Sequence, residues 1–286
     1  MTIALATSTA ARPHDTDLPF LLDAARAAGV EAQITVWDDP AIEWDTFDLV
    51  VVRSCWDYMS RREEFLAWAA SVRHIANPAD VLAWNTDKVY LRQLADAGIP
   101  VIPTQWNVQP GDDLGQHTEW VVKPSISAGS RDTARWTSPD DVYAHSADLQ
   151  ATGRTAMVQP YIASVDAEGE TAILSIGGSF SHAICKAALL MPGEGIRQDR
   201  DSREEISARK PTTAQLAVAE AALAAIGPAM GSAPDLLYSR VDLVTGLDGE
   251  PMVIELELTE PSLFLHTHAE APARLIAAAA SRISRR

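Results

Sequence analysis

The chain has 286 residues, of which 47% are hydrophobic and 22% charged, a composition typical of a folded globular protein with a sizeable core. Its net charge of −16 argues against broad binding to nucleic acid or to an anionic membrane, because both need a basic surface. The first ten residues lack the basic segment of a signal peptide, and the apolar runs are shorter than a membrane span. Cys55 and Cys185 fit no metal-binding or disulfide pattern, so we expect a cytoplasmic location, with neither nucleic acid nor membrane as a partner.

The N-terminal segment is predicted to form a small parallel α/β unit. Strands are expected at residues 2–6, 33–37 and 48–53, with a helix at 20–28 between the first two. The third strand is apolar throughout and ends at the polar and aromatic sequence RSCWDY. Open α/β sheets bind ligands at the carboxyl ends of their strands, so this end is a candidate ligand site. A helix-start loop capped by Asp57 is the alternative.

Lysine is rare in this chain, because only four of its 23 basic residues are lysines. Lys88 is predicted in the first turn of a helix that ends at Ala97, where the helix dipole disfavours a cation. Lys123 lies near the end of an expected strand at 119–124 and precedes the small-residue loop Ser125–Ser130, whose hydroxyls and backbone N–H groups suit phosphate. A surface lysine and a plain turn are the alternatives. The sequence contains neither a Walker A motif nor GxGxxG.

The middle of the chain is predicted to contain a hinge, because the sequence Gln159-Pro160-Tyr161-Ile162 interrupts a strand pattern. Two strands joined across Gly177-Gly178 follow, and the second places His182 and Lys186 on one face. A structural role for His182 is the alternative. The charged stretch 191–211 is interpreted either as a loop that orders over a ligand or as a disordered connection. The other expected elements are strands at 132–136 and 155–159 and helices at 61–72, after Pro139, at 213–226 and at 271–285.

The most informative local pattern is a hairpin in which two alternating strands flank the turn dipeptide Asp248-Gly249. A two-residue turn pairs Asp242 with Glu255 and Arg240 with Glu257, and the alternation of side chains puts these four charged hairpin residues on one face. The opposite face would carry Val241, Leu243, Met252, Ile254, Leu256 and Leu258. Three neighbouring carboxylates repel one another, so they need cations, which Arg240 and a divalent metal such as Mg²⁺ would supply. A solvated outer face of an edge hairpin is the alternative.

Four stretches, taken in order, resemble the ATP-grasp superfamily along the whole chain: NTDKVYLRQL, VVKPSISAGS, MVQPYI…EGE and YSRVDLV…IELELTEPS. Within that superfamily the chain is similar to the small ligases related to RimK and glutathione synthetase. The sequences RSCWDY, WNTDK, SHAICK and ELTEPSLFL resemble the subgroup that contains the cyclo-ligase closing the ring of D-cycloserine. The resemblance implies an α/β ATP-grasp fold, with a parallel N-terminal domain at 1–84, a central lobe at 85–161, and a C-terminal lobe with the metal site at 162–286. The two lobes would clasp the nucleotide.

The resemblance also implies roles for individual residues. ATP would be bound at its phosphates by Lys88, Lys123, Ser125, Ser127, Gly129 and Ser130, at adenine by Gln159, Pro160, Tyr161 and Ile162, and at ribose by Glu168 or Glu170. The metal ligands would be Asp242, Glu255 and Glu257, although many relatives carry Asn at the last position. The catalytic candidates are Arg240, Lys186 and His182. The substrate would face Arg53, Ser54, Asp57, Tyr58, Glu260 and Ser262.

The implied activity is that of an ADP-forming ligase that uses ATP and Mg²⁺, with two ions expected and Mn²⁺ as a substitute. A carboxylate of a small, amino-acid-like substrate would attack the γ-phosphate, and an amine or an internal nitrogen would then displace phosphate from the acyl phosphate. The alternatives are a nucleotide-binding regulatory protein without turnover and a kinase that stops after phosphoryl transfer. The oligomeric state is left open, with a homodimer as one of the options, because dimers are common among related ligases.

Overall fold

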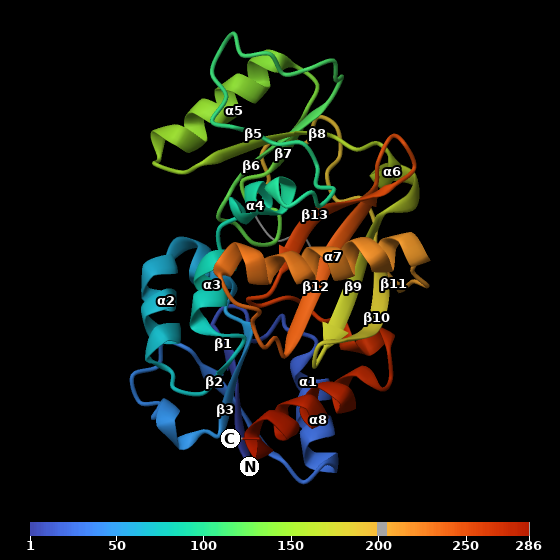
Figure 1. Ribbon diagram of the computed structural model, residues 1–286. Helices are drawn as coiled ribbons and strands as arrows, with labels where there is room; N and C mark the ends of the chain where they lie inside the picture. Colours follow the sequence, from blue (N-terminus) through green and yellow to red (C-terminus); the bar gives the residue numbers. More distant parts are fainter. Residues whose placement is uncertain (199–204, 286) are drawn as a thin grey trace.

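A computed structural model describes residues 1–198 and 205–285 and contains three separate β-sheets (Figure 1). The first is parallel, in the order β2-β1-β3-β4, and consists of β1 (Thr2–Thr7), β2 (Glu31–Val36), β3 (Leu49–Ser54) and β4 (Ile75–Ala76). The second is antiparallel, in the order β5-β8-β6-β7, and consists of β5 (Gln105–Trp106), β6 (Trp120–Pro124), β7 (Ala134–Trp136) and β8 (Ala156–Pro160). The third is also antiparallel, in the order β11-β10-β9-β12-β13, and consists of β9 (Glu170–Ile176), β10 (Ser179–Lys186), β11 (Ile206–Ala208), β12 (Tyr238–Thr245) and β13 (Pro251–Glu257). Each sheet falls within one of the three chain segments predicted from the sequence.

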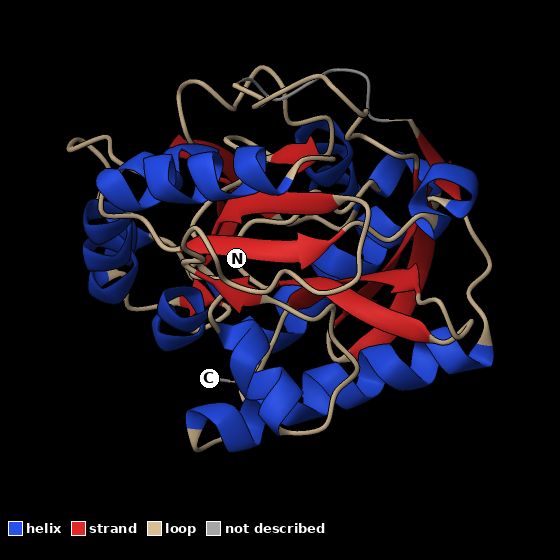
Figure 2. Ribbon diagram, turned by 90° about the horizontal axis from the view of Figure 1, so that it is seen from above, coloured by secondary structure: helices blue, strands red, loops and turns tan. Residues whose placement is uncertain are grey.

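Helices surround these strands (Figure 2). They are α1 (Leu18–Ala27), α2 (Arg62–Ser71), α3 (Ala79–Asn85), α4 (Tyr90–Asp96), α5 (Pro139–Ala151), α6 (Ser164–Glu168), α7 (Thr213–Met230) and α8 (Ala271–Ser284). Single 3-10 turns lie at Trp44–Thr46, Trp56–Ser60 and Leu265–Thr267. Of the charged stretch 191–211, residues 199–204 lie outside the described part of the chain, so neither interpretation of that stretch is tested.

Helix α7 begins where the sequence predicts and ends four residues later than expected. Thr212 forms a capping box with Gln215, which satisfies backbone N–H groups at the helix start. In the described part of the chain, α7 is the one helix whose length and apolar composition would allow it to cross a membrane. In this fold it packs against β12 and β13, and its alanine-rich face, which includes Ala219 and Ala222, is buried in the core.

One hydrophobic core joins the beginning and the end of the chain. Leu5 of β1 and Leu21 of α1 pack in the same cluster as Leu174 of β9 and Leu275 of α8. Helices α1 and α8 lie against each other beside this cluster (Figure 1). The N-terminal sheet is therefore fixed to the third sheet, and the loops after β1 and β3 are held close to the polar end of β12 and β13.

The β12–β13 hairpin has the register predicted for the four charged hairpin residues, but it reaches that register through a different turn. The backbone N–H of Gly246 donates to the carbonyl of Glu250, so the loop contains three residues and not two. Gly249 supplies the positive φ of 83° that such a loop needs. A bulge next to Asp242 then shifts the pairing by one residue, which restores the predicted pairs of Asp242 with Glu255 and Arg240 with Glu257.

The same bulge reverses the faces predicted for Met252 and Ile254. Val253 is fully buried in the core instead, because the extra residue interrupts the alternation of side chains. Met252 and Ile254 pack on the other side of the sheet, beside Ile162 and Val244. The prediction for these two residues was wrong, since an alternating pattern cannot reveal an inserted residue.

Lys88 lies in a turn between two helices and not in the first turn of one. Helix α3, which was not expected, ends at Asn85, and α4 begins at Tyr90. The unfavourable dipole therefore does not explain the position of this lysine. Its backbone N–H donates to the carbonyl of Ser125 at 2.9 Å, so the turn is attached directly to the small-residue loop after β6.

Candidate active site

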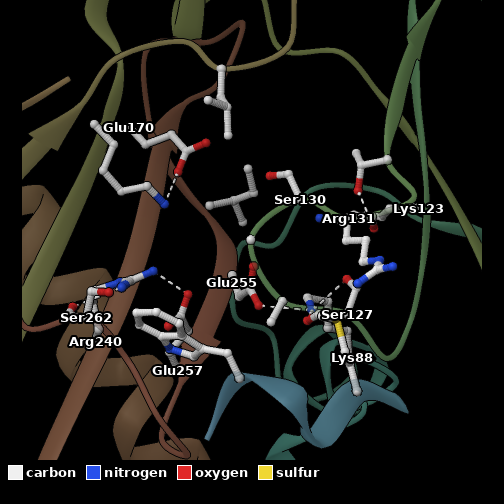
Figure 3. A pocket seen from close by; sticks show the side chains of 18 of the residues that line it. Lys88, Lys123, Ser127, Ser130, Arg131, Glu170, Arg240, Glu255, Glu257 and Ser262 are labelled. Atoms are coloured by element: carbon white, nitrogen blue, oxygen red, sulfur yellow. Dashed lines mark hydrogen bonds and ion pairs between the residues drawn. The ribbon is translucent and has the colours of Figure 1, made fainter. Parts of the chain in front are cut away.

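A cavity of about 1090 Å³ is lined by residues of the second and third sheets and by loops from all three (Figure 3). Most of the predicted site residues line it: Asp57, Tyr58, Lys88, Lys123, Ser127, Gly129, Ser130, Gln159, Pro160, Tyr161, Ile162, Glu170, Lys186, Arg240, Glu255, Glu257, Glu260 and Ser262. Six predicted site residues are not among those that line it: Arg53, Ser54, Ser125, Glu168, His182 and Asp242. Figure 3 shows Lys123, Ser130 and Arg131 facing Glu170, Arg240 and Glu257 across the cavity.

Two buried lysines form the basic side of the cavity. Lys88 is 5% exposed, and its Nζ donates to the carbonyl of Ser127 at 2.8 Å and lies 3.1 Å from Glu255 Oε1. Lys123 is 8% exposed, and its burial lowers the pKa of its ammonium despite the opposing charge of Glu255. The proximity of Lys88 lowers that pKa further. Two cations held this close together favour an anionic ligand between them.

The loop after Lys123 contains a turn that faces the cavity. Gly129 and Ser130 both adopt a positive φ, of 62° and 57°, and both line the cavity. Successive residues of this kind can point their N–H groups into one concave surface. Ser127 is tied to Lys88 at the base of the loop, whereas Ser125 lies below the cavity lining.

A chain of alternating charges crosses the third sheet. Asp242 accepts hydrogen bonds from Arg240 Nε at 2.8 Å, from Arg240 Nη2 at 2.9 Å and from Lys186 Nζ at 2.8 Å. Burial alone would raise the pKa of Asp242, but Arg240 and Lys186 hold it at about 2. Lys186 also lies 2.7 Å from Glu170, and Arg240 bonds Glu257. The alternative prediction, that this face of the hairpin is exposed to solvent, is wrong, because Arg240 and Asp242 are only 5% and 1% exposed.

The surroundings of Glu257 disfavour the ionised form of its carboxyl group. Its burial raises the pKa to about 7, and the neighbouring charges of Glu255 and Asp242 add to this effect, although Arg240 opposes it. The pKa of Glu255 is lowered instead, because Lys88 and Lys123 outweigh its burial. A second cation beside Glu257, in addition to Arg240, would favour the ionised carboxylate.

The predicted metal ligands fit a divalent cation in chemistry but do not form a ready-made cage. Among the described residues, no group of three His, Cys, Asp or Glu side chains is arranged to hold a metal ion. Asp242 is covered by Lys186 and Arg240 in this structure, whereas Glu255 and Glu257 line the cavity and offer the carboxylate oxygens that Mg²⁺ prefers. The position of Glu255 and Glu257 at alternate residues of β13, both lining the cavity, is the observation that favours a cation between them.

The predicted hinge forms an apolar end of the cavity. Ile162 packs with Ile102 and Val244, and Tyr161 and Ile254 lie at the edge of the same cluster. Sequence reasoning missed the residue that fixes this hinge, because an arginine at a short strand carries no local signal. Arg135 stacks on Tyr161 at 3.5 Å and forms ion pairs with Glu119 on one side and Asp166 on the other.

The other end of the cavity is lined by two loops of the N-terminal segment and by residues 260–266. Asp57 is oriented by Trp37 Nε1, which donates to its carboxylate at 3.0 Å, while Tyr58 is buried beside it. Cavity residues that sequence reasoning missed include Ser8, His14, Trp56, Phe264 and His266. Phe264 and His266 follow Glu260 and Ser262 at two-residue spacing, but Phe264 is left-handed and Leu265–Thr267 is a 3-10 turn, so strand alternation would not have predicted them.

Arg53, Ser54 and His182 point away from the cavity, so the predictions of direct substrate contact and of catalysis are corrected for them. Arg53 is 1% exposed and bonds Asp17 and the carbonyl of Pro261, while Ser54 bonds Thr7. Both belong to the fully buried strand β3, and the cavity begins after that strand ends. His182 bonds the carbonyl of Leu263 and lies four residues before Lys186, roughly 13 Å back along β10.

Glu168 and Glu170 separate clearly in the structure. Glu168 ends α6 and its carboxylate accepts a hydrogen bond from Thr245, outside the cavity lining. Glu170 begins β9 and lines the cavity beside Lys186. Only Glu170 is therefore placed to contact a ligand in the cavity.

Comparison with known proteins matches the chain to one family. Residues 3–79 match the model of the N-terminal domain of D-cycloserine synthetase DcsG. The chain is 39% identical over 304 residues to the cycloserine biosynthesis protein DcsG of Streptomyces lavendulae, and the match covers 98% of both chains. The crystal structure of D-cycloserine synthetase DcsG is similar with a TM-score of 0.90 and 38% identity, covering 99% of this chain and 100% of the other.

More distant structures share the fold. The ATP-grasp ligase PsnB, complexed with its minimal precursor, has a TM-score of 0.65 at 17% identity and covers 98% of this chain and 99% of its own. D-alanine–D-alanine ligase from Bacillus anthracis, complexed with ATP, has a TM-score of 0.65 at 14% identity, with 100% and 98% covered. The predicted ATP-grasp fold and the predicted subgroup are thereby confirmed. The chain belongs to the D-cycloserine synthetase DcsG family of ATP-grasp proteins and is an ATP-dependent ligase.

Proposed function

We propose that this ligase activates the carboxylate of an amino-acid-like substrate as an acyl phosphate and then forms a C–N bond, with ATP converted to ADP. One observation carries the proposal. A single cavity joins the two buried lysines and the small-residue loop to residues 260–266, and Arg240, Glu255 and Glu257 of the hairpin line it as well. Such a cavity can hold a nucleotide and a small acceptor side by side.

The basic end suits the nucleotide. Lys88, Lys123 and the loop at Ser127–Ser130 would neutralise and enclose the phosphates, since two buried cations and a concave backbone favour an anion. The apolar cluster around Ile162 would accept adenine, against the backbone of residues 159–162. Glu170 is assigned to the ribose hydroxyls, because Glu168 does not line the cavity. In this assignment the lobes at 85–161 and 162–286 clasp the nucleotide between them.

The carboxylate end of the hairpin suits the metal. Glu255 and Glu257 would hold Mg²⁺, or Mn²⁺ in its place, and Asp242 would complete the set once it is shared between the metal and Arg240. We expect two ions. Bound Mg²⁺ neutralises the charge that develops on a transferring phosphoryl group.

The side chains of the chain itself supply positioning and charge. In the first step a carboxylate oxygen of the substrate bonds to the γ-phosphorus, and the bond from that phosphorus to the bridging oxygen of ADP breaks. In the second step an amine nitrogen bonds to the carboxyl carbon and loses a proton, and inorganic phosphate leaves with the electrons of the C–O bond. Arg240 and Lys186 lie where they can stabilise the negative charge of both steps.

The family relationship narrows the acceptor chemistry. D-cycloserine synthetase, by its name, makes a cyclic product, so we infer ring closure in which the nucleophilic nitrogen and the carboxylate belong to one molecule. Arg240 suits the carboxylate of such a substrate, while Glu260 and Asp57 suit its ammonium group. Intermolecular ligation by the same acyl phosphate route is the nearest variant.

The proposal is tested by Mg²⁺-dependent ADP release in the presence of amino acids, their O-ureido and acyl derivatives, and amine pairs. The expected result is strong stimulation by one substrate and loss of that stimulation in Glu255→Gln, which excludes contaminating ATPases. ATP binding without turnover across the panel would favour the regulatory alternative, and a stable phosphorylated product would favour a kinase. Product mass separates ring closure from intermolecular ligation. A homodimer is still a prediction, and the molar mass in solution, measured by light scattering, would test it.

A further inference from the structure

Residues 260–266 present alternate side chains to the cavity. Glu260, Ser262, Phe264 and His266 line it, whereas Leu263 and Leu265 point into the core shared by the two ends of the chain. The segment follows β13 but pairs with no strand, so its backbone hydrogen bonds must be satisfied by other groups. At Pro261, Leu263 and Leu265 those groups are buried side chains that do not line the cavity.

Asp17 holds the centre of this segment with both carboxylate oxygens. Its Oδ2 accepts the backbone N–H of Leu263 at 2.7 Å, and its Oδ1 accepts that of Leu265 at 2.8 Å. The residue between them, Phe264, adopts a left-handed conformation with φ 49° and ψ 44°, which is unfavourable for a residue with a side chain. The carboxylate of Asp17 therefore accepts hydrogen bonds from the backbone on both sides of Phe264, the residue in the strained conformation. Asp17 is 1% exposed and does not touch the cavity.

Arg53 and His182 hold the flanks of the same segment. Arg53 Nη2 lies 3.3 Å from Asp17 Oδ2 and donates to the carbonyl of Pro261 at 3.0 Å. His182 Nε2 donates to the carbonyl of Leu263 at 2.9 Å. Three elements that are distant in sequence, the start of α1, strand β3 and strand β10, thus converge on five residues.

The strained conformation has a consequence on the cavity side. The ring of Phe264 lies 5.4 Å from the guanidinium carbon of Arg240, and Arg240 Nη1 donates to the carbonyl of Ser262 at 3.0 Å. A cation over an aromatic ring is attracted to it, so the pinned segment also sets the position of Arg240. If Phe264 relaxed to an ordinary backbone conformation, the ring and the carbonyl of Ser262 would both move relative to Arg240.

We propose that Asp17, supported by Arg53 and His182, is a positioning residue for the acceptor end of the site. It acts through residues 261–265, which it holds in the strained conformation that presents Ser262 and Phe264 to the substrate and to Arg240. The proposal deepens the proposed function and rests on it for the identity of the acceptor. The nucleotide end lies on other elements, so Asp17 should not affect it.

The decisive variant is Asp17→Asn, which keeps the side-chain size but replaces one acceptor oxygen with an amide that faces a donor. The KM for the acceptor substrate should rise about tenfold or more, while the KM for ATP changes less than about twofold. Arg53→Met should also raise the KM for the acceptor substrate. Arg53→Lys should raise it less, because an ammonium can still pair with Asp17. Leu21→Ala is the matched control, since it weakens the same core but removes none of the side-chain hydrogen bonds to the segment.

Hydrogen exchange gives a readout that does not depend on any substrate. In wild type the amides of Leu263 and Leu265 should be protected, and Asp17→Asn should speed their exchange about tenfold or more while the amides of β9 keep their protection. If no substrate is turned over, the proposed function is refuted, but the exchange rates of Leu263 and Leu265 still test the role of Asp17. Unchanged exchange at Leu263 and Leu265 would overturn the positioning role. Equal rises in both KM values, or an effect matched by Leu21→Ala, would overturn it as well.

Discussion

Lys88 Nζ lies 3.1 Å from Glu255 Oε1, so the turn before α4 is joined directly to the hairpin that carries the acidic residues. The same ammonium donates to the backbone of Ser127 in the loop after β6. One buried lysine therefore contacts both sides of the cavity. Under the proposed function, Lys88 would exchange its contact with Glu255 for one with phosphate, and Glu255 would then be free to hold the metal ion.

Replacing Lys123 with alanine should weaken ATP binding. The ammonium is buried beside Lys88, and it is expected to contribute a charge-assisted contact to the phosphates that solvent screens little. We expect the Kd for ATP to rise roughly tenfold to a hundredfold, measured by calorimetry. Lys210→Ala is the control, since Lys210 is exposed and outside the cavity lining. Equal affinities in the two variants would contradict the assignment.

Asp242→Asn should abolish turnover while leaving the protein folded. The carboxylate accepts three hydrogen bonds from Arg240 and Lys186, and a neutral amide cannot serve as their counter-ion and offers a metal only one uncharged oxygen. We expect kcat to fall more than about a hundredfold, measured as ADP release. Asp248→Asn alters an exposed carboxylate at the turn of the same hairpin and should keep wild-type kinetics. Wild-type kinetics in Asp242→Asn would remove this residue from the mechanism.

Tyr90→Phe should weaken both folding and metal use. The hydroxyl of Tyr90 donates to the carbonyl of Leu256 at 2.8 Å and accepts its N–H at 2.9 Å, on the open edge of β13 between Glu255 and Glu257. Its loss leaves two buried backbone groups unpaired, which costs about 1–3 kcal/mol. The Mg²⁺ concentration for half-maximal activity should rise, because the carboxylates lose their fixed spacing.

The matched control for this prediction is Tyr238→Phe. That hydroxyl is also buried, but it bonds the carbonyls of Val52 and Thr259 at the base of the hairpin. We expect a loss of stability in urea unfolding without a change in Mg²⁺ dependence. Equal Mg²⁺ dependence in the two variants would show that Tyr90 has no special role.

The raised pKa of Glu257 predicts a pH dependence of stability without metal. A pKa of about 7 in the folded protein, against the ordinary value of 4.5 for a glutamate, means that the folded state binds more protons between those values. The free energy of unfolding should therefore fall as pH rises from 5 to 8, more steeply in wild type than in Glu257→Gln. Asp242, whose pKa is held at about 2, contributes in the opposite sense and only at acid pH. Parallel pH curves for the two proteins, measured in EDTA, would contradict the prediction.

The sequence predicts those features of the site that follow from alternation and from rare residues. The register of Arg240 against Glu257 was right. The rarity of lysine pointed to all four lysines, of which Lys88, Lys123 and Lys186 line the cavity and Lys210 does not. The bulge beside Asp242 could not be predicted, because a three-residue loop plus one inserted residue gives the same pairing as a two-residue loop.

Contacts between distant segments explain the other misses. Arg53 ends a strand at the edge where ligands bind in open α/β sheets, yet its guanidinium turns toward Asp17 and the carbonyl of Pro261. His182 shares a strand face with Lys186 but lies four residues from the cavity end. Strand periodicity shows which face of the sheet a side chain occupies, but not how far along the strand a cavity begins. Neither outcome could therefore be predicted from the sequence.

The most direct test of carboxylate activation follows an oxygen atom. An O-ureido amino acid that stimulates ADP release is labelled with ¹⁸O in its carboxylate and turned over with unlabelled ATP, and the released phosphate is analysed by mass spectrometry. Attack of the carboxylate on the γ-phosphorus predicts one ¹⁸O atom in each phosphate, because the C–O bond of the acyl phosphate breaks in the second step. Unlabelled phosphate formed at the rate of product formation would contradict an acyl phosphate at this site.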